Sequence, residues 1–334
     1  MKEHYSLALL AAAGVAVLVW ARRRADRSGV RLVHRTASYL VVSKPAGLSC
    51  HKWTGGSAPS GPAQPGPGWQ PAPRDDEEPT LVDVLRAWPG VGNAIHLVHR
   101  LDRATSGLLL VGRTSAAAAE LAAALEGGTK IYACLVRGTT EEAFTVDRPL
   151  RQRAAKVAHR TKQKRDALRD ERQTQEARTA FVRLAVCCDG HCSLLLALPS
   201  TGRYHQLRRH LEGLRHPISG DEEHGPPRLN ELLRSEYGLG RLFLHACCLL
   251  LSAEGEALAA TAPRAATGGR LCFTCRLPPD LRAPLGRMPG GAQALARLEE
   301  VLGEVERAGE AGWLAEARRK AASVLRSDTW RAAG

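Results

Sequence analysis

The chain contains 334 residues, of which 44% are hydrophobic and 24% charged, and this composition excludes a chain that is disordered throughout. The formal net charge of +13 favours a polyanionic partner, either a nucleic acid or an anionic membrane surface. Aromatic residues make up only 4% of the chain, which argues against an open platform on which single-stranded RNA bases stack.

Residues 1–30 have the composition of a hydrophobic anchor or a targeting segment. The sixteen residues from 6 to 21 carry no charge and fall just short of the ~17–25 that usually span a bilayer. Three arginines, Arg22, Arg23 and Arg24, follow directly. Three interpretations remain open: a membrane anchor that leaves the rest of the chain facing the cytosol or an organelle matrix, a presequence for a mitochondrion or plastid, and a helix that packs on the domain.

The next predicted elements surround a proline-rich segment. A β-branched run at residues 40–42 predicts a strand that ends at the turn KPAG, residues 44–47. Residues 54–79 are rich in Pro, Gly and Ser and cannot bury enough apolar surface to fold, so we interpret them as a disordered insertion. Residues 81–88 then predict a short helix.

A strand, a helix and a second strand follow a polar loop. The apolar run at residues 107–112 has the length and content of a buried strand. Thr114 is the predicted N-cap of a helix over residues 115–126, which the glycine pair after it ends. Residues 130–138 predict the next strand.

A basic insertion occupies residues 148–175. Between residues 148 and 172 there are ten Lys or Arg and three acidic residues. A solvated helix or loop is the ordinary interpretation of such a charge run, and a contact with an RNA backbone is the other.

The remaining elements complete an α+β pattern. Further strands are predicted at residues 179–187, 193–198, 242–251 and 269–277, and a turn that leads into a helix at residues 202–213. Residues 286–334 predict a C-terminal helical extension, with helices at 292–308 and 311–326. Several strands with few helices between them indicate a main domain over residues 31–285 with a central, mainly antiparallel mixed sheet flanked by helices.

The cysteines do not indicate a disulfide framework or a metal site. There are nine of them, an odd number in a long chain. Cys272 and Cys275 form a CxxC, but the chain has no second pair at the spacing of a zinc site. It also lacks the GxGxxG and GxxxxGK[ST] phosphate loops. We therefore expect buried or half-buried thiols, no metal and no cofactor.

The polar loop before residue 107 has the character of a catalytic loop. It places one carboxylate, Asp102, between Arg100 and Arg103. Neighbouring cations favour the ionised, nucleophilic form of such a carboxylate. A structural salt bridge is the more frequent reason for the same cluster, so the loop by itself leaves both interpretations open.

Residues 99–110 (HRLDRATSGLLL) closely resemble the signature of the RluA-type pseudouridine synthases. Five further segments resemble motifs of that family in the same order, namely residues 39–51, 130–138, 201–210, 216–221 and 241–246. The resemblance extends over about residues 31–285 and implies the family's catalytic domain, which needs no cofactor. Residues 220–225 (GDEEHG) are most similar to the TruC-like branch, which modifies tRNA.

The resemblance implies roles for the matching residues. Asp102 is similar to the catalytic nucleophile, Arg208 to its ion-pair partner, and Tyr132 to the tyrosine that stacks on the target base and assists the removal of its C5 proton. Arg100 is similar to the arginine that helps to hold the target nucleotide out of the stack. The other candidates for substrate binding are Arg103, Lys44, Arg203 and His205.

The expected function is the isomerisation of specific uridines in tRNA or rRNA by a monomeric enzyme. The alternative is a catalytically silent RNA-binding protein of the same fold. In such a protein we expect Asp102, Tyr132 or Arg208 to have been replaced, but all three residues are present. A membrane-tethered adaptor with a basic surface accounts for the N-terminus and the charge but for none of the motifs.

Overall fold

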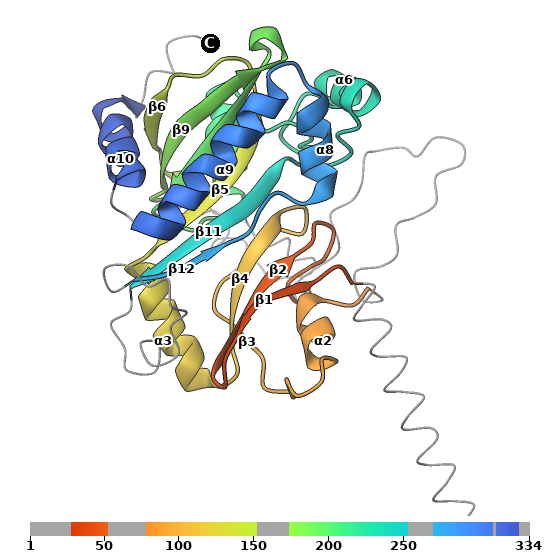
Figure 1. Ribbon diagram of the computed structural model, residues 1–334, viewed down its shortest axis with the longest axis vertical. Helices are drawn as coiled ribbons and strands as arrows, with labels where there is room; N and C mark the ends of the chain where they lie inside the picture. Colours follow the sequence, from red (N-terminus) through yellow and green to blue (C-terminus); the bar gives the residue numbers. More distant parts are fainter. Residues whose placement is uncertain (1–27, 53–77, 152–173, 253–269, 310–311, 327–334) are drawn as a thin grey trace, which may run out of the picture.

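Strands from the whole chain combine into one large mixed sheet (Figure 1). The computed structural model describes residues 28–52, 78–151, 174–252, 270–309 and 312–326. The strands are β1 (Arg31–Arg35), β2 (Tyr39–Lys44), β3 (His96–Leu97), β4 (Ser106–Gly112), β5 (Thr129–Arg137), β6 (Ala143–Asp147), β7 (Leu150–Arg151), β8 (Thr174–Gln175), β9 (Arg178–Cys187), β10 (Cys192–Pro199), β11 (Leu244–Ser252), β12 (Arg270–Thr274) and β13 (Leu325–Arg326). The helices are α2 (Leu81–Arg86), α3 (Ser115–Glu126), the 3-10 turn η1 (Cys188–Gly190), α5 (Gln206–Gly213), α6 (Pro227–Tyr237), α8 (Pro279–Arg287), α9 (Gly291–Ala308) and α10 (Trp313–Ser323).

The order of the strands confirms the α+β fold. The main path of the sheet is β1-β2-β4-β11-β5-β10-β9-β6-β13, with β12 beside β11 and β3 beside β4. The pairs β4–β11 and β6–β13 are parallel, and the other pairs of this sheet are antiparallel. The predicted mainly antiparallel mixed sheet is therefore present.

The C-terminal helices share the main core rather than forming a separate one. Helix α9 lies across the face of the sheet that Figure 1 shows. Its buried residues Leu298, Val301 and Val305 belong to the same apolar cluster as the interior of β5, β10 and β11. Full burial of each such side chain stabilises the folded state by roughly 1.5–3 kcal/mol relative to leaving it exposed. The predicted extension and catalytic domain are thus packed together.

The local signals in the sequence account for most elements but miss two helices and several strands, among them β6. The Oγ1 of Thr114 accepts a hydrogen bond from the N–H of Ala117 at 3.1 Å, so α3 begins where its cap predicted. Helices α6 and α8 were not predicted. Each begins with a proline at its first position, and α8 also contains Pro284. Proline is compatible with the first turn of a helix, but inside a pattern it is ordinarily a sign that the helix ends.

Gly107 fixes the parallel contact between β4 and β11. Its φ is +120°, and it stands opposite Ala246 in the register of the two strands. A Cβ at this position would lie 2.3 Å from the carbonyl oxygen of Ala246. Only glycine permits this approach and this φ. The loop that carries Asp102 enters β4 directly before this contact.

Parts of four predicted segments lie outside the described residues. They are residues 1–27 of the N-terminal segment, 54–77 of the proline-rich insertion, 152–173 of the basic insertion, and 310–311 and 327–334 of the C-terminal extension. At the two ends of the basic insertion, β7 and β8 pair with each other in a short antiparallel ladder. In the part of the chain that is described, none of the helices has the length and apolar content to cross a membrane.

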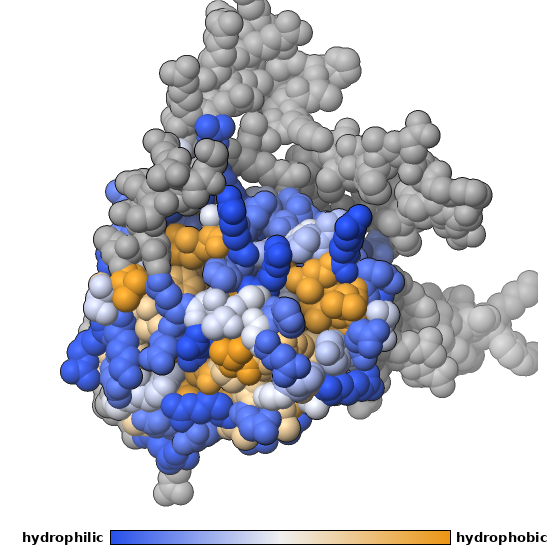
Figure 2. All heavy atoms as spheres, turned by 90° about the horizontal axis from the view of Figure 1, so that it is seen from above, coloured by the Kyte–Doolittle hydropathy of each residue, from blue (hydrophilic) through white to orange (hydrophobic). Residues whose placement is uncertain are grey.

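The cysteines, which all lie within the described residues, form no disulfide bonds. All nine are free thiols, eight of them buried and Cys272 half-buried, which confirms the predicted buried or half-buried thiols. Viewed from above, hydrophilic side chains cover most of the described surface, and the apolar groups form separate patches among them (Figure 2).

Candidate active site

One small pocket gathers the predicted catalytic residues. It has a volume of about 100 Å³. It is lined by Arg100, Leu101, Asp102, Tyr132, Pro199, Thr201, Gly202, Arg203, His205, Gln206, Leu207, Arg208 and Leu244. Asp102 comes from the loop between β3 and β4, Tyr132 from β5 and Arg208 from α5. Ligand sites usually measure ~300–1,000 Å³, so this pocket is smaller than a typical ligand site.

Asp102 lies at the mouth of the pocket, with its side chain 31% exposed. Its Oδ2 is 3.9 Å from Nη1 of Arg208 and 3.8 Å from Nε2 of His205. Burial raises the pKa of the Asp102 carboxyl, Arg208 and Lys44 lower it, and the carboxylates of Asp221 and Glu223 raise it. Arg208 and Lys44, rather than the flanking Arg100 and Arg103 that the sequence suggested, therefore offset part of the cost of keeping this carboxylate ionised, but they do not lower its pKa below the ordinary value.

The close partner of Arg208 is Asp221, which was not among the predicted site residues. Nε of Arg208 donates to Oδ2 of Asp221 at 2.6 Å, and Nη2 donates to Oδ1 at 2.7 Å. The Asp221 side chain has no exposed surface and also accepts the backbone N–H groups of Glu223 and His224. The predicted pairing of Arg208 with Asp102 is present only as the long 3.9 Å contact. A bidentate ion pair is stronger than a single long contact, so Asp221 is the residue that fixes the guanidinium group of Arg208. Asp102 makes only the 3.9 Å contact with Nη1.

The segment around Asp221 is itself fixed by Asn230 on α6. Oδ1 of Asn230 accepts the backbone N–H of Gly220 at 2.9 Å, and its Nδ2 donates to the carbonyl oxygen of Asp221 at 2.8 Å. The motif HPISGD, residues 216–221, was the signal in the sequence that marked this segment. It did not reveal that its last residue anchors Arg208.

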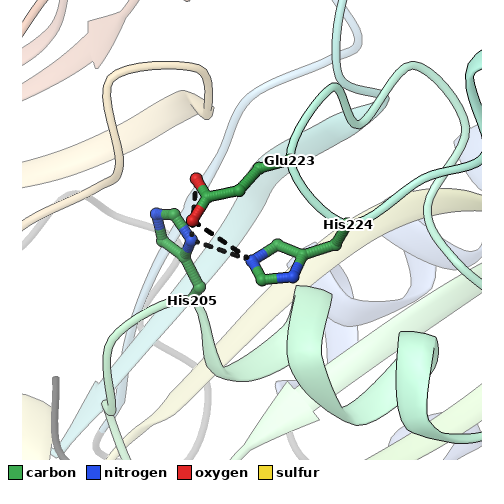
Figure 3. A group of neighbouring side chains, drawn as sticks. All are labelled: His205, Glu223 and His224. Carbon is green, nitrogen blue, oxygen red and sulfur yellow. Dashed lines mark hydrogen bonds and ion pairs between the residues drawn. The ribbon is translucent and has the colours of Figure 1, made fainter. Parts of the chain in front are cut away.

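His205 joins Glu223 and His224 in a polar group beside the pocket (Figure 3). Nδ1 of His205 is 3.2 Å from Nε2 of His224 and 3.6 Å from Oε2 of Glu223. Groups spaced in this way can hold a metal ion. Here Nη2 of Arg208 already lies 3.6 Å from the same Glu223 oxygen, and Nη1 lies 2.9 Å from Nδ1 of His205. We therefore interpret the group as a network that balances the permanent charge of Arg208.

The backbone of His205 is strained. Its φ is +50° at the N-cap of α5, a left-handed conformation that is uncommon for residues other than glycine. Such outliers cost about 1–3 kcal/mol and cluster at functional sites. Gln206 holds the preceding turn, because its Oε1 accepts from Oγ1 of Thr201 at 2.7 Å and from the N–H of Arg203 at 3.0 Å.

Tyr132 is half-buried on β5 and packs against the apolar clusters on both sides of the pocket. Burial, and then the negative charge of Asp102, raises the pKa of its phenol. The hydroxyl group of Tyr132 therefore stays protonated at neutral pH.

Of the predicted substrate-binding residues, two are exposed arginines of the pocket. Arg100 and Arg203 both line it, and both are exposed. Nη1 of Arg100 lies 3.5 Å from Nε2 of His51, and Nε of Arg203 donates to the carbonyl oxygen of Glu176 at 2.9 Å. Neither contact is a buried ion pair, so both guanidinium groups remain exposed at the pocket.

Lys44 and Arg103 instead hold the catalytic loop in place. Lys44 is completely buried, and its Nζ donates to the carbonyl oxygens of Pro45, Leu48 and Arg103 at 2.8, 2.8 and 3.2 Å. Burial lowers the pKa of this ammonium group to about 8. Arg103 pairs with Glu78 at 2.7 Å. The prediction that Lys44 contacts RNA conflicts with this position, because its side chain has no exposed surface.

Comparison with known proteins identifies the family. Residues 38–213 match the family model described as RNA pseudouridylate synthase. The chain is 32% identical over 241 residues to tRNA pseudouridine synthase C of Yersinia pestis, which covers 70% of this chain and 86% of that protein. It is 31% identical over 229 residues to tRNA pseudouridine synthase C of Vibrio parahaemolyticus, which covers 65% of this chain and 82% of that protein.

The fold is also similar to solved human structures. The structure of human RNA Pseudouridylate Synthase Domain Containing 4 has a TM-score of 0.55 at 22% identity and covers 81% of this chain and 95% of its own. That of human RNA Pseudouridylate Synthase Domain Containing 1 has a TM-score of 0.51 at 23% identity, with 80% and 95% covered. These likenesses concern the fold. The family model and the bacterial relatives show that the chain belongs to the RNA pseudouridylate synthase family, as an enzyme of the RluA type.

Proposed function

We propose that this enzyme converts a uridine of tRNA to pseudouridine, with Asp102 as its nucleophile. One observation carries the assignment of the site: Asp102, Tyr132 and Arg208, which come from a loop, a strand and a helix, line the same pocket. The choice of tRNA is supported by the relatives that are 31–32% identical over about two thirds of the chain, since their names specify tRNA.

The proposed reaction exchanges one bond for another. The bond between uracil N1 and ribose C1′ breaks, the ring turns within the pocket, and uracil C5 bonds to C1′. The proton on C5 leaves, and N1 gains one, so the product is an isomer of the substrate. Asp102 begins the reaction by attack on C1′ or on the uracil ring, and the bond that it forms breaks again before the product leaves, so the carboxylate is regenerated. Both routes need an ionised carboxylate shielded from water, and both need the base to leave the stack.

The residues around Asp102 keep it ionised and bind the substrate. Arg208 favours the ionised form of Asp102 and orients it, while its own position is fixed by Asp221. Tyr132 presents its ring to the extruded uracil. Arg100 and Arg203, exposed at the mouth, bind the phosphates beside it.

The test compares Asp102→Asn with Asp189→Asn, an equally conservative change at an exposed position on η1 outside the pocket. We expect pseudouridine mapping of unmodified tRNA transcripts to find a converted site with the wild type and the control, and none with Asp102→Asn, although that variant still binds the RNA. Conversion by Asp102→Asn would overturn the assignment of the nucleophile. Binding without conversion by the wild type would support the catalytically silent alternative. Conversion of rRNA, but of no tRNA, would show that the substrate is rRNA instead of tRNA.

A further inference from the structure

A second and larger cavity adjoins the active-site pocket. Its volume is about 630 Å³, within the ~300–1,000 Å³ of typical ligand sites. It shares the lining residues Pro199, Thr201 and Gly202 with the active-site pocket, so the two lie side by side. We call it the flanking cavity. Its other walls come from α3, from the beginnings of β5 and β9, and from α10.

The flanking cavity collects positive charge from three separate elements. Lys130 of β5, Arg178 of β9 and Arg318 of α10 all line it, against a single lining acid, Glu126. Arg178 has a partner in Asp147, but the 3.6 Å pair is exposed at both ends and therefore weak. Burial lowers the pKa of Lys130, and a bound anion would offset that effect. The charge of the cavity thus fits a polyanionic occupant.

Helix α10 is held firmly enough to form a wall. Leu314, Ala317 and Ala321 are buried, and Oγ1 of Thr145 on β6 donates to the carbonyl oxygen of Ala321 at 2.8 Å. Arg318 projects from the same helix, and its Nη2 donates to Oγ1 of Thr129 at 2.6 Å. This contact directs the guanidinium toward the beginning of β5, beside Lys130. The whole of α10 lies after residues 38–213, which match the family model.

We propose that the flanking cavity binds the RNA nucleotides next to the target uridine, and that α10 contributes to substrate recognition through Arg318. This inference rests on the proposed function, because it requires the target uridine to occupy the adjoining pocket. An RNA strand is the occupant that its position favours. A nucleotide inserted at Asp102 continues on both sides into a charged backbone, and one of those sides borders the shared residues Thr201 and Gly202.

The test compares Arg318→Gln with Arg319→Gln. Arg319 is the next residue of the same helix, is exposed and does not line the cavity. For the RNA that the wild type modifies, we expect Arg318→Gln to raise KM about tenfold, the value of one charge-assisted contact, with kcat within twofold of the wild type. The control and the conservative variant Arg318→Lys should keep a KM within threefold of the wild type.

The dependence of binding on salt gives an independent readout. In Asp102→Asn protein, where no conversion occurs, the slope of log Kd against log salt should fall by about 0.7 in Arg318→Gln, the value for one phosphate contact with a single strand. The control should keep the slope. Equal KM values and equal slopes for the two glutamine variants would overturn the inference while leaving the proposed function intact. If the wild type modifies no tRNA, the proposed substrate fails, and the slope measured on single-stranded RNA still decides the role of the cavity.

Discussion

Arg208 and Asp221 form the closest ion pair of the active site, at 2.6 and 2.7 Å, whereas Arg208 approaches Asp102 only to 3.9 Å. The pair is buried and both of its contacts are made through the rigid fork of the guanidinium. Nη1 lies 2.9 Å from Nδ1 of His205 and 3.9 Å from Oδ2 of Asp102. Asp221 is therefore a positioning residue, because it fixes the group that stabilises the ionised form of Asp102.

Replacement of Asp221 should separate this positioning role from the chemistry. Asp221→Asn removes one charge of a buried pair and leaves Arg208 without its partner, which typically costs about 3–5 kcal/mol. We expect urea unfolding to show a loss of that order, and the rate of isomerisation to fall as well. Glu222→Gln is the control, because Glu222 is the next residue and is 81% exposed. It should stay within about 0.5 kcal/mol of the wild type.

The acid limb of the pH–rate profile should shift in opposite directions in the variants Arg208→Gln and Glu223→Gln. The nucleophile acts as a carboxylate, so the single-turnover rate should fall as the pH drops through the pKa of Asp102. Arg208 lowers that pKa and Glu223 raises it. Arg208→Gln should therefore shift the acid limb to higher pH, and Glu223→Gln should shift it to lower pH. Identical acid limbs in the wild type and Glu223→Gln would show that Asp102 does not set this limb.

Tyr132→Phe should distinguish stacking from proton transfer. The variant keeps the aromatic ring and removes only the oxygen, so we expect unchanged affinity for RNA. If that oxygen assists the removal of the C5 proton, the rate should fall by about 10²-fold or more. We expect a smaller fall, because burial and the charge of Asp102 raise the pKa of the phenol and keep it protonated, which makes it a poor base. A rate equal to that of the wild type would limit Tyr132 to stacking.

Gly107→Ala should prevent correct folding. The new Cβ would lie 2.3 Å from a backbone oxygen of β11, at a φ of +120° that alanine does not adopt easily. We expect little soluble protein and a loss of the cooperative thermal transition. Gly240→Ala is the matched control, since nothing lies within 4 Å of the place that its new Cβ would take and its φ is not in the left-handed region. Normal folding of Gly107→Ala would contradict the account of the β4–β11 contact.

The sequence predicts the elements of this fold better than their pairing. The strand at 107–112 and the cap at Thr114 follow from signals within a few residues, and both are present. The parallel contact between Gly107 and Ala246 joins segments far apart in the chain, so no local pattern predicts it. Helices α6 and α8 were missed because prolines at their starts, and Pro284 within α8, conceal the helical pattern.

For the active site, too, the sequence predicts which residues take part but not how their side chains pair. The resemblance to the family placed Asp102, Tyr132 and Arg208 correctly in one pocket. It could not predict that Arg208 is held by Asp221, because the choice between two carboxylates depends on side-chain geometry in the folded protein. Lys44 shows the converse case. Lys44 was a candidate for substrate binding, but three carbonyl oxygens accept hydrogen bonds from its buried ammonium group.

The position of β11 between β4 and β5 has a consequence for synthesis on the ribosome. Strands β4 and β5, which carry or adjoin the catalytic residues, emerge early, whereas the strand that joins them is translated much later. Until then their apolar edges stay open, and such edges favour aggregation. A nascent chain that ends before residue 244 contains Asp102, Tyr132 and Arg208 but lacks the strand that brings them together. Activity thus depends on translation reaching β11, and we expect the growing chain to be most prone to aggregation before that point.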